Sequence, residues 1–177
     1  MAGEFFKFAE RVVEKINPNL RGRTRAQTRS IGILTAPDAE KHFKALERAC
    51  NKNFQTGLRP ASTDGLYIII HDGAFGEVDA FVNLEWTLDG RGVNDNDGYV
   101  LIGLLCGTGW GSHILEATKA AAVEENVIIA LYPENEKLER YYWNCGFRDR
   151  PKCWRQKLGK MEFRPPSRRK IDRIGQM

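Results

Sequence analysis

The chain has 177 residues, of which 42% are hydrophobic and 28% charged, a composition typical of one folded domain of ordinary size. Its formal net charge is +4, and no apolar run approaches the roughly 18 residues that a membrane-spanning helix requires. Charged residues interrupt the apolar ones at the N-terminus, so we expect neither a signal peptide nor a membrane segment. The four cysteines lack the CxxC spacing of a zinc site, and we expect them to be reduced thiols in a cytoplasmic protein.

An amphipathic helix is predicted at the N-terminus over residues 3–16, and Pro18 is expected to end it. The aliphatic run at 29–36 predicts a first strand. Pro37 and Asp38 then favour the start of a second helix, because Asp is a good capping residue and Pro suits a first turn. The apolar stripes expected on these helices are Phe5, Ala9, Val12, Val13 and Ile16 on the first and Ala39, Phe43, Leu46 and Cys50 on the second.

The middle of the chain has the pattern of strands. Runs at 66–73 and 77–88 are separated by a short glycine-containing connection, which predicts a hairpin. After a loop rich in glycine, asparagine and aspartate, the nearly continuous apolar run at 99–106 is typical of a central strand covered on both faces.

The pattern changes to alternating helix and strand after Cys106. A glycine segment leads into a helix whose buried stripe we expect at Ile114, Leu115, Thr118 and Ala122. The apolar run at 127–132 predicts a further strand. Residues 135–146 predict a helix that ends at Gly146. Broken strand character at 153–158 precedes a basic C-terminal tail.

The glycine segment after Cys106 has the composition of a phosphate-binding turn. Gly107, Gly109 and Gly111 allow close approach of an anion, and the first N–H groups of the following helix have no partner within it. A tight structural turn has the same composition and remains an alternative. The P-loop pattern is excluded because no lysine follows before Lys119, and the dinucleotide fingerprint fits poorly because Ser112 replaces its third glycine.

Residues 99–147 resemble the GNAT superfamily of N-acetyltransferases. The family's cofactor motif, Gln/Arg-x-x-Gly-x-Gly/Ala, is matched by Gly109 and Gly111, with Cys106 at the Gln/Arg position. A second family feature, Asn-x-x-Ala-x-x-Phe-Tyr followed by Gly-Phe, corresponds to Asn135, Leu138, Tyr141, Tyr142, Gly146 and Phe147.

The resemblance implies an α/β (α+β) fold with a mixed, mostly antiparallel central sheet flanked by helices. It divides the chain into an N-terminal helical and basic extension (1–28), an acetyltransferase domain (29–163) and a basic tail (164–177). The implied cofactor is acetyl-coenzyme A. The backbone amides of the glycine segment would hold its pyrophosphate, and a backbone N–H near Leu104 or Leu105, where Gly103 could permit a bulge, would polarise the thioester carbonyl. The cofactor-binding residues implied are Leu104, Leu105, Cys106, Gly107, Thr108, Gly109, Trp110, Gly111, Ser112 and Asn135.

The resemblance also implies catalytic roles, each with a structural alternative. Tyr142 occupies the position of the family's tyrosine acid, which protonates the leaving thiolate; a core aromatic residue is the alternative. Asn135, which would contact the pantetheine arm, is equally well interpreted as a helix N-cap. Glu85 is the first candidate for the base that deprotonates the amine, with an outward-facing strand carboxylate as the alternative; Asp97 and His113 are weaker candidates.

Three functions therefore stay open at the level of sequence. The first is acetyl transfer to a primary amine of a small molecule or protein. The second is acetylation of aminoacyl-tRNA, since the basic residues near both ends of the chain suit RNA. The third is a GNAT-like protein that binds coenzyme A without catalysis. The family resemblance also suggests a homodimer.

Overall fold

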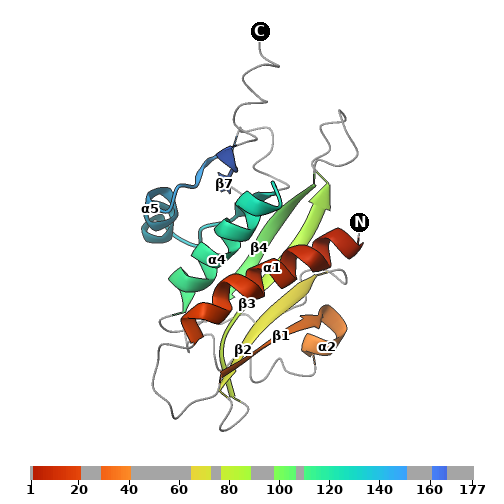
Figure 1. The fold of residues 1–177 in the computed structure, drawn as a ribbon. Helices are drawn as coiled ribbons and strands as arrows, with labels where there is room; N and C mark the ends of the chain where they lie inside the picture. Colours follow the sequence, from red (N-terminus) through yellow and green to blue (C-terminus); the bar gives the residue numbers. More distant parts are fainter. Residues whose placement is uncertain are drawn as a thin grey trace. The chain divides into compact units, whose positions relative to one another are not determined.

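The computed structural model describes residues 2–20, 29–40, 65–72, 77–88, 98–106, 110–150 and 161–166 (Figure 1). The helices are α1 (Ala2–Leu20), α2 (Ala36–Glu40), α4 (Gly111–Glu124) and α5 (Glu136–Asn144). The strands are β1 (Arg29–Thr35), β2 (Leu66–Asp72), β3 (Glu77–Leu88), β4 (Gly98–Cys106), β5 (Ile128–Leu131), β6 (Arg148–Asp149) and β7 (Met161–Phe163).

The strands form a seven-stranded sheet in the order β1-β2-β3-β4-β5-β7-β6. The β4–β5 pair is parallel, whereas the pairs β1–β2, β2–β3, β5–β7 and β6–β7 are antiparallel. The predicted fold class, a mixed and mostly antiparallel sheet with flanking helices, is confirmed. The chain divides into two compact units, one of Met1–Glu85 with Gly103–Ala121 and the other of Trp86–Ile102 with Ala122–Met177.

In the first unit, the predicted hairpin is confirmed as β2 and β3, which pair antiparallel with Leu66 opposite Leu84. The side chains of 66–70 and 80–84 are all buried, so both faces of this hairpin are covered. Most of these side chains are aliphatic or Phe. Tyr67 and Asn83, which stand directly opposite each other, bring polar groups into this apolar environment.

Helix α1 packs against β1 and β2. Its buried residues recur every three or four positions, as expected for one face of an amphipathic helix: Phe5, Phe8, Ala9, Val12 and Ile16. The prediction omitted Phe8 and included Val13, which is only half-buried. The prediction that Pro18 ends the helix was wrong, because α1 continues to Leu20; in a last turn, proline removes only one helical hydrogen bond. None of the described helices is both long and apolar enough to cross a membrane.

Helix α2 begins at Ala36, directly after β1. The hydroxyl of Thr35 donates a hydrogen bond to the Asp38 carboxylate at 2.9 Å. The prediction that Asp38 caps this helix was therefore wrong: Asp38 lies in the first turn, where its charge is favourable to the helix dipole. Ala39 is buried as predicted, whereas Phe43, Leu46 and Cys50 lie outside the described residues.

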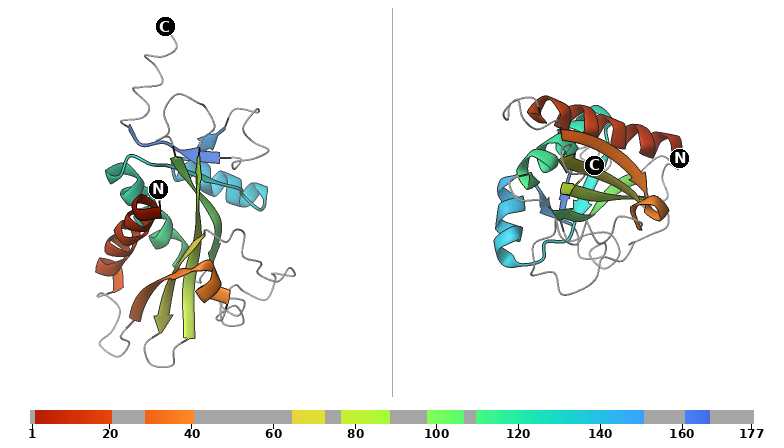
Figure 2. Two further views of the ribbon diagram at one scale, coloured as in Figure 1. Left: turned by 90° about the vertical axis from the view of Figure 1, so that its right-hand side faces the viewer. Right: turned by 90° about the horizontal axis from the view of Figure 1, so that it is seen from below.

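Helix α4 confirms its predicted stripe, because Ile114, Leu115, Thr118 and Ala122 are all buried. The Thr118 hydroxyl donates to the Ile114 carbonyl at 2.7 Å, so this buried polar group is satisfied within the helix. Most of α4 belongs to the first unit, together with α1. Figure 2 shows both helices on one side of β2 and β3.

In the second unit, β5 is a four-residue strand with every side chain buried, as its apolar run predicted. Its last residue, Leu131, stands opposite Ile102 of β4, so the parallel register covers only Tyr99 to Ile102. Strand β7 pairs with β5 on one side and β6 on the other. The sequence did not predict β7, and the strand predicted at 153–158 lies outside the described residues.

A buried ion network secures β7 in this unit. Arg150 Nε lies 2.8 Å from Glu162 Oε2, and the Arg150 side chain is wholly buried at 0% exposure. Arg164 pairs with the other carboxylate oxygen of Glu162. Because a buried charge is tolerated only with a partner, Glu162 on β7 fixes both guanidinium groups in place.

Candidate active site

The predicted cofactor segment joins the end of β4 to the start of α4. Trp110 directly precedes the helix, and its carbonyl oxygen accepts the N–H of Ile114 at 2.9 Å. Helix geometry leaves the N–H groups of Gly111, Ser112 and His113 without partners inside α4. The part of the prediction that lies outside the described residues comprises Gly107, Thr108 and Gly109 and the side chains of Leu104, Leu105 and Cys106.

The start of α4 is open enough for an anion. A Cβ atom built on Gly111 would meet nothing within 4 Å, and the Ser112 side chain is exposed. The Trp110 indole is buried and meets the His113 ring edge-on at 5.9 Å, so the two rings brace the first turn. Unbonded N–H groups, the helix dipole and free space together fit a phosphate group.

Asn135 is the N-cap of α5. Its side-chain Oδ1 accepts the N–H of Leu138 at 3.0 Å, and its backbone is extended, as in a regular cap. The alternative interpretation of Asn135, a helix N-cap, is therefore confirmed. A contact between Asn135 and the pantetheine arm stays a prediction.

Tyr142 is held by the way α5 ends. Gly146 has a φ of 93° and its N–H bonds the Trp143 carbonyl at 3.1 Å, while the N–H of Phe147 bonds the Tyr142 carbonyl at 3.0 Å. These two bonds define a Schellman motif. Such a motif is often accompanied by a contact between two side chains, which in this helix belong to Tyr142 and Phe147. Their rings lie 5.8 Å apart. The Gly-Phe pair that follows the helix thus determines the position of the tyrosine ring.

The phenol of Tyr142 keeps its proton more firmly than a free tyrosine. Burial raises its pKa, and the nearby Cys145 and Glu134 raise it further. The side chain is half-buried, and Cys145 is a free thiol. The phenol is therefore protonated at neutral pH, as a group must be to act as a general acid.

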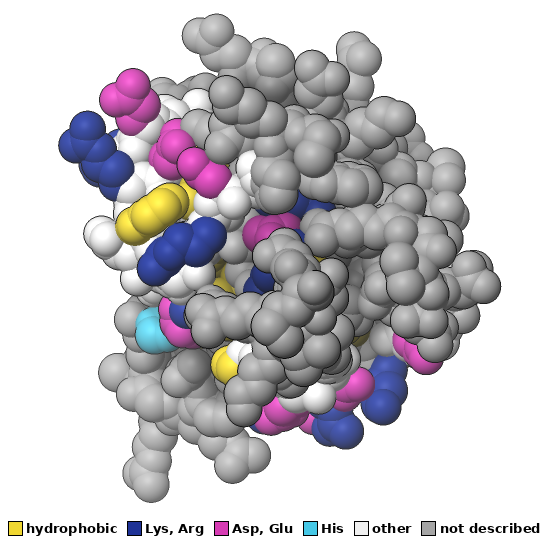
Figure 3. Space-filling view, turned by 90° about the horizontal axis from the view of Figure 1, so that it is seen from above, with side chains coloured by type: hydrophobic (Ala, Val, Ile, Leu, Met, Phe, Trp, Pro, Cys, Tyr) yellow, Lys and Arg dark blue, Asp and Glu magenta, His cyan; other side chains and the backbone are white. Residues whose placement is uncertain are grey.

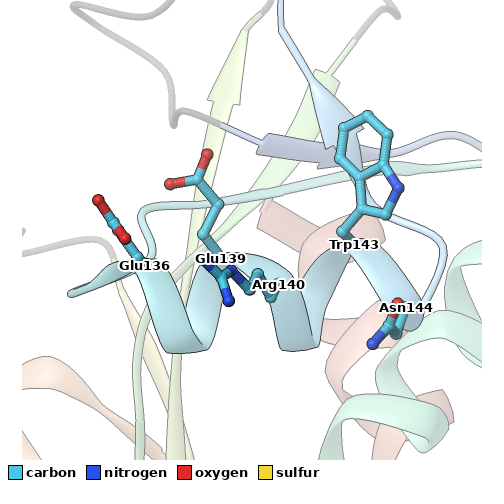
Figure 4. Close-up of a pocket in the computed structure, with 5 residues that line it drawn as sticks. All are labelled: Glu136, Glu139, Arg140, Trp143 and Asn144. Atoms are coloured by element: carbon cyan, nitrogen blue, oxygen red, sulfur yellow. The ribbon is translucent and has the colours of Figure 1, made fainter.

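Helix α5 also borders a hollow of about 510 Å³ (Figure 4). Glu139 and Trp143 project from the same side of the helix. The guanidinium of Arg148 lies 4.6 Å from the Trp143 ring centre, a cation–π contact. The described lining residues are Glu136, Glu139, Arg140, Trp143 and Asn144. Tyr142 is not among them, so this hollow is separate from the candidate acid.

Glu85 lies on β3 in the first unit and is half-buried. Its Oε1 atom is buried without a hydrogen-bond partner among the described residues. Burial raises the pKa of this carboxyl group. A carboxylate that is partly desolvated and unpartnered is compatible with a general base, and this role of Glu85 stays a prediction.

Two polar residues near Glu85, Asn83 and Tyr67, were not identified as candidates from the sequence. Asn83 is 2% exposed, and its Nδ2 atom has no hydrogen-bond partner in the described part of the chain. Tyr67 faces Asn83 across the hairpin, and its pKa is raised by burial and by the charge of Glu85. Alternation along β3 puts Asn83 and Glu85 on one face. The sequence signal for Asn83, an amide within the apolar run at 80–84, did not by itself indicate a site.

Other candidates are less well placed. Asp97 lies outside the described residues. His113 is half-buried against Trp110 rather than facing solvent. The described side chains include no cluster of His, Cys, Asp or Glu able to hold a metal ion. Contact with RNA and formation of a homodimer stay predictions.

No protein-family model matches the sequence, and no curated protein matches it significantly. Among solved structures, a protein from Lactobacillus plantarum assigned as an N-acetyltransferase has a TM-score of 0.52 and 16% identity, covering 77% of this chain and 98% of its own. A variant of the AtaT toxin bound to the C-terminus of the antitoxin AtaR has a TM-score of 0.49 and 21% identity, covering 81% of this chain and 96% of its own.

A further match is AtaTR bound with acetyl-coenzyme A, with a TM-score of 0.44 and 15% identity, covering 81% of this chain and 97% of its own. At these identities the likeness concerns the fold alone. The sheet order, the glycine segment before α4 and the Lactobacillus match agree on one architecture. The chain therefore has the fold of the GNAT acetyltransferases.

Proposed function

We propose that the chain is an N-acetyltransferase that moves an acetyl group from acetyl-coenzyme A to a primary amine. The observation that carries this proposal is the start of α4 at Gly111, inside the glycine motif that follows β4. It provides unbonded helix N–H groups and open space at the position where the family motif requires a phosphate-binding backbone.

Acetyl-coenzyme A supplies a thioester, whose acetyl carbon forms the new C–N bond as its C–S bond breaks. The backbone of β4 polarises the carbonyl oxygen through an N–H of Leu104 or Leu105. Support for this role comes from the register, because β5 ends opposite Ile102 and leaves the last residues of β4 beyond that pairing.

Two side chains move protons in the proposed reaction. Glu85 accepts a proton from the attacking amine, directly or through water, and its unpartnered, partly desolvated oxygen supports this role. Tyr142 donates its phenolic proton to the departing thiolate, and this role is supported by its raised pKa only in that the phenol stays protonated until the thiolate forms. Asn135 contributes to binding the pantetheine arm.

The proposal is tested by titration calorimetry with acetyl-coenzyme A and, as a control nucleotide, NAD. We expect acetyl-coenzyme A alone to bind. Gly111→Val should weaken binding by about tenfold or more, since its side chain occupies the open space before the first N–H groups. Gly32→Val is the matched control, because a Cβ at Gly32 of β1 also meets nothing within 4 Å.

Binding that is equal in both variants would show that Gly111 belongs to a structural turn. If the wild-type protein does not bind acetyl-coenzyme A, the proposed function is rejected.

A further inference from the structure

Strand β3 carries a hydrogen-bond donor, Asn83, and an acceptor, Glu85, that do not bond to each other. Asn83 and Glu85 are two residues apart on one strand face, so their Cβ atoms are separated by about 6 to 7 Å. Asn83 Nδ2 and Glu85 Oε1 could bond one another, yet both are buried and unpartnered among the described residues.

This arrangement is unfavourable for the fold by itself. A buried polar atom without a partner loses its hydration and gains nothing in return. Asn83 lies between Val82 and Leu84, which are both apolar and buried. Buried polar groups in native proteins are nearly always bonded, so two unsatisfied ones on one strand face need an explanation, and a bound ligand that completes them is one.

We infer that Asn83 determines acceptor specificity by donating a hydrogen bond to an oxygen atom of the acceptor. This oxygen lies next to the amine from which Glu85 accepts a proton. The acceptor class is thus a primary amine with a hydroxyl or carbonyl oxygen a few bonds from its nitrogen. This inference rests on the proposed function, because Glu85 must face the amine.

The test compares two amines of nearly equal size, 2-aminoethanol and propylamine, in which a hydroxyl group replaces a methyl group. Release of the coenzyme A thiol gives kcat/KM for each. We expect the wild-type protein to prefer 2-aminoethanol by about tenfold, mainly through KM, as one hydrogen bond to a buried donor provides. Asn83→Leu should reduce this ratio to about one.

A control variant and a stability measurement separate recognition from folding. Thr118→Val also removes a buried polar group, but one that already bonds the Ile114 carbonyl, so it should leave the ratio unchanged. Because Asn83→Leu replaces an unpartnered amide with an apolar group of similar size, its Tm should equal or exceed that of the wild type.

The outcomes distinguish this inference from the proposed function. Transfer to both amines with no preference, or a preference that survives Asn83→Leu, would overturn the inference and leave the acetyltransferase intact. A lower Tm with an unchanged ratio would assign Asn83 a structural role. Binding of acetyl-coenzyme A without transfer to either amine would overturn the inference, because its acceptor class includes 2-aminoethanol, whereas failure to bind acetyl-coenzyme A would reject the proposed function as well.

Discussion

At the scale of single residues, Tyr142 separates catalysis from binding. The hydroxyl is the only group lost in Tyr142→Phe, and the ring contact with Phe147 at 5.8 Å is retained. We expect kcat to fall by about 100-fold or more, as for the loss of a general acid, with the affinity for acetyl-coenzyme A and the Tm unchanged. Calorimetry and thiol-release kinetics measure the two effects. Unchanged kcat would favour another proton donor for the thiolate.

Glu85 should show a trade-off between activity and stability. Burial raises its pKa, so the folded state binds this proton more tightly than the unfolded chain does. The resulting stabilisation is complete below the unfolded pKa, near 4, and is lost as the pH rises through the raised folded pKa.

We therefore expect Glu85→Gln to be more stable than the wild type at pH 7, by about 1 kcal/mol, and to match it below about pH 4. Its kcat should fall by about 100-fold, because the amide cannot accept the proton. Urea unfolding at both pH values measures the stability. A loss of stability at pH 7 would mean that the carboxylate has a structural partner.

The candidate site was only partly predictable at this scale. Tyr142 and Asn135 were chosen from a motif with fixed spacing, and the structure places Asn135 at the N-cap of α5 and Tyr142 within it, while their roles stay predictions. Asn83 was missed because its importance depends on register: only the pairing with Tyr67 shows that it faces a buried polar neighbour. No local pattern distinguishes such a residue from an asparagine on an exposed strand face.

At the scale of elements, the end of α5 links stability to the acid. Gly146 has a φ of 93°, which costs an L-amino acid about 1 to 2 kcal/mol, and a Cβ there would also touch the Phe163 ring at 3.8 Å. We expect Gly146→Ala to lower the free energy of unfolding by that amount and to reduce kcat, because the Schellman motif positions Tyr142. Denaturant unfolding and kinetics measure these effects.

Gly3→Ala is the matched control, since Gly3 lies in helix α1 with nothing within 4 Å of a Cβ atom. It should leave kcat unchanged and stabilise the protein slightly, as alanine favours a helix. A Gly146→Ala variant with normal kcat would show that Tyr142 is positioned independently of the helix end.

The elements that the sequence predicted well are those with long patterns of their own. Helix α1, the β2–β3 hairpin and α4 each repeat their apolar period over several turns or alternations. Strand β7 has three residues and is defined by its neighbours β5 and β6 rather than by any period. The start of α2 was misplaced because Thr35 and Asp38 are both suitable capping residues.

At the scale of the molecule, charge is spread rather than concentrated on the described surface. Figure 3 shows acidic and basic side chains interspersed on the face that it draws. Along α5, Glu136 and Glu139 alternate with Lys137 and Arg140. With a net charge of only +4, this part of the surface offers no extended field of one sign, and we expect recognition to depend on local groups such as Asn83 and Glu85.

The two compact units should respond differently to loss of the buried ion network. Glu162→Ala leaves the fully buried Arg150 without its 2.8 Å partner, which we expect to cost about 3 to 5 kcal/mol. Hydrogen exchange should show faster opening of β5 and β7, with the β2–β3 hairpin less affected because it lies in the other unit. Equal acceleration in both would show that they unfold as one.

The position of β7 has a consequence for how the protein is made. Its three residues enter the sheet between β5 and β6, although the ribosome synthesises them after both. Until Met161–Phe163 have left the exit tunnel, β5 lacks its antiparallel neighbour and β6 has none of the pairing it makes with β7. A nascent chain stalled shortly before Met161 would therefore expose an open strand edge to chaperones and proteases.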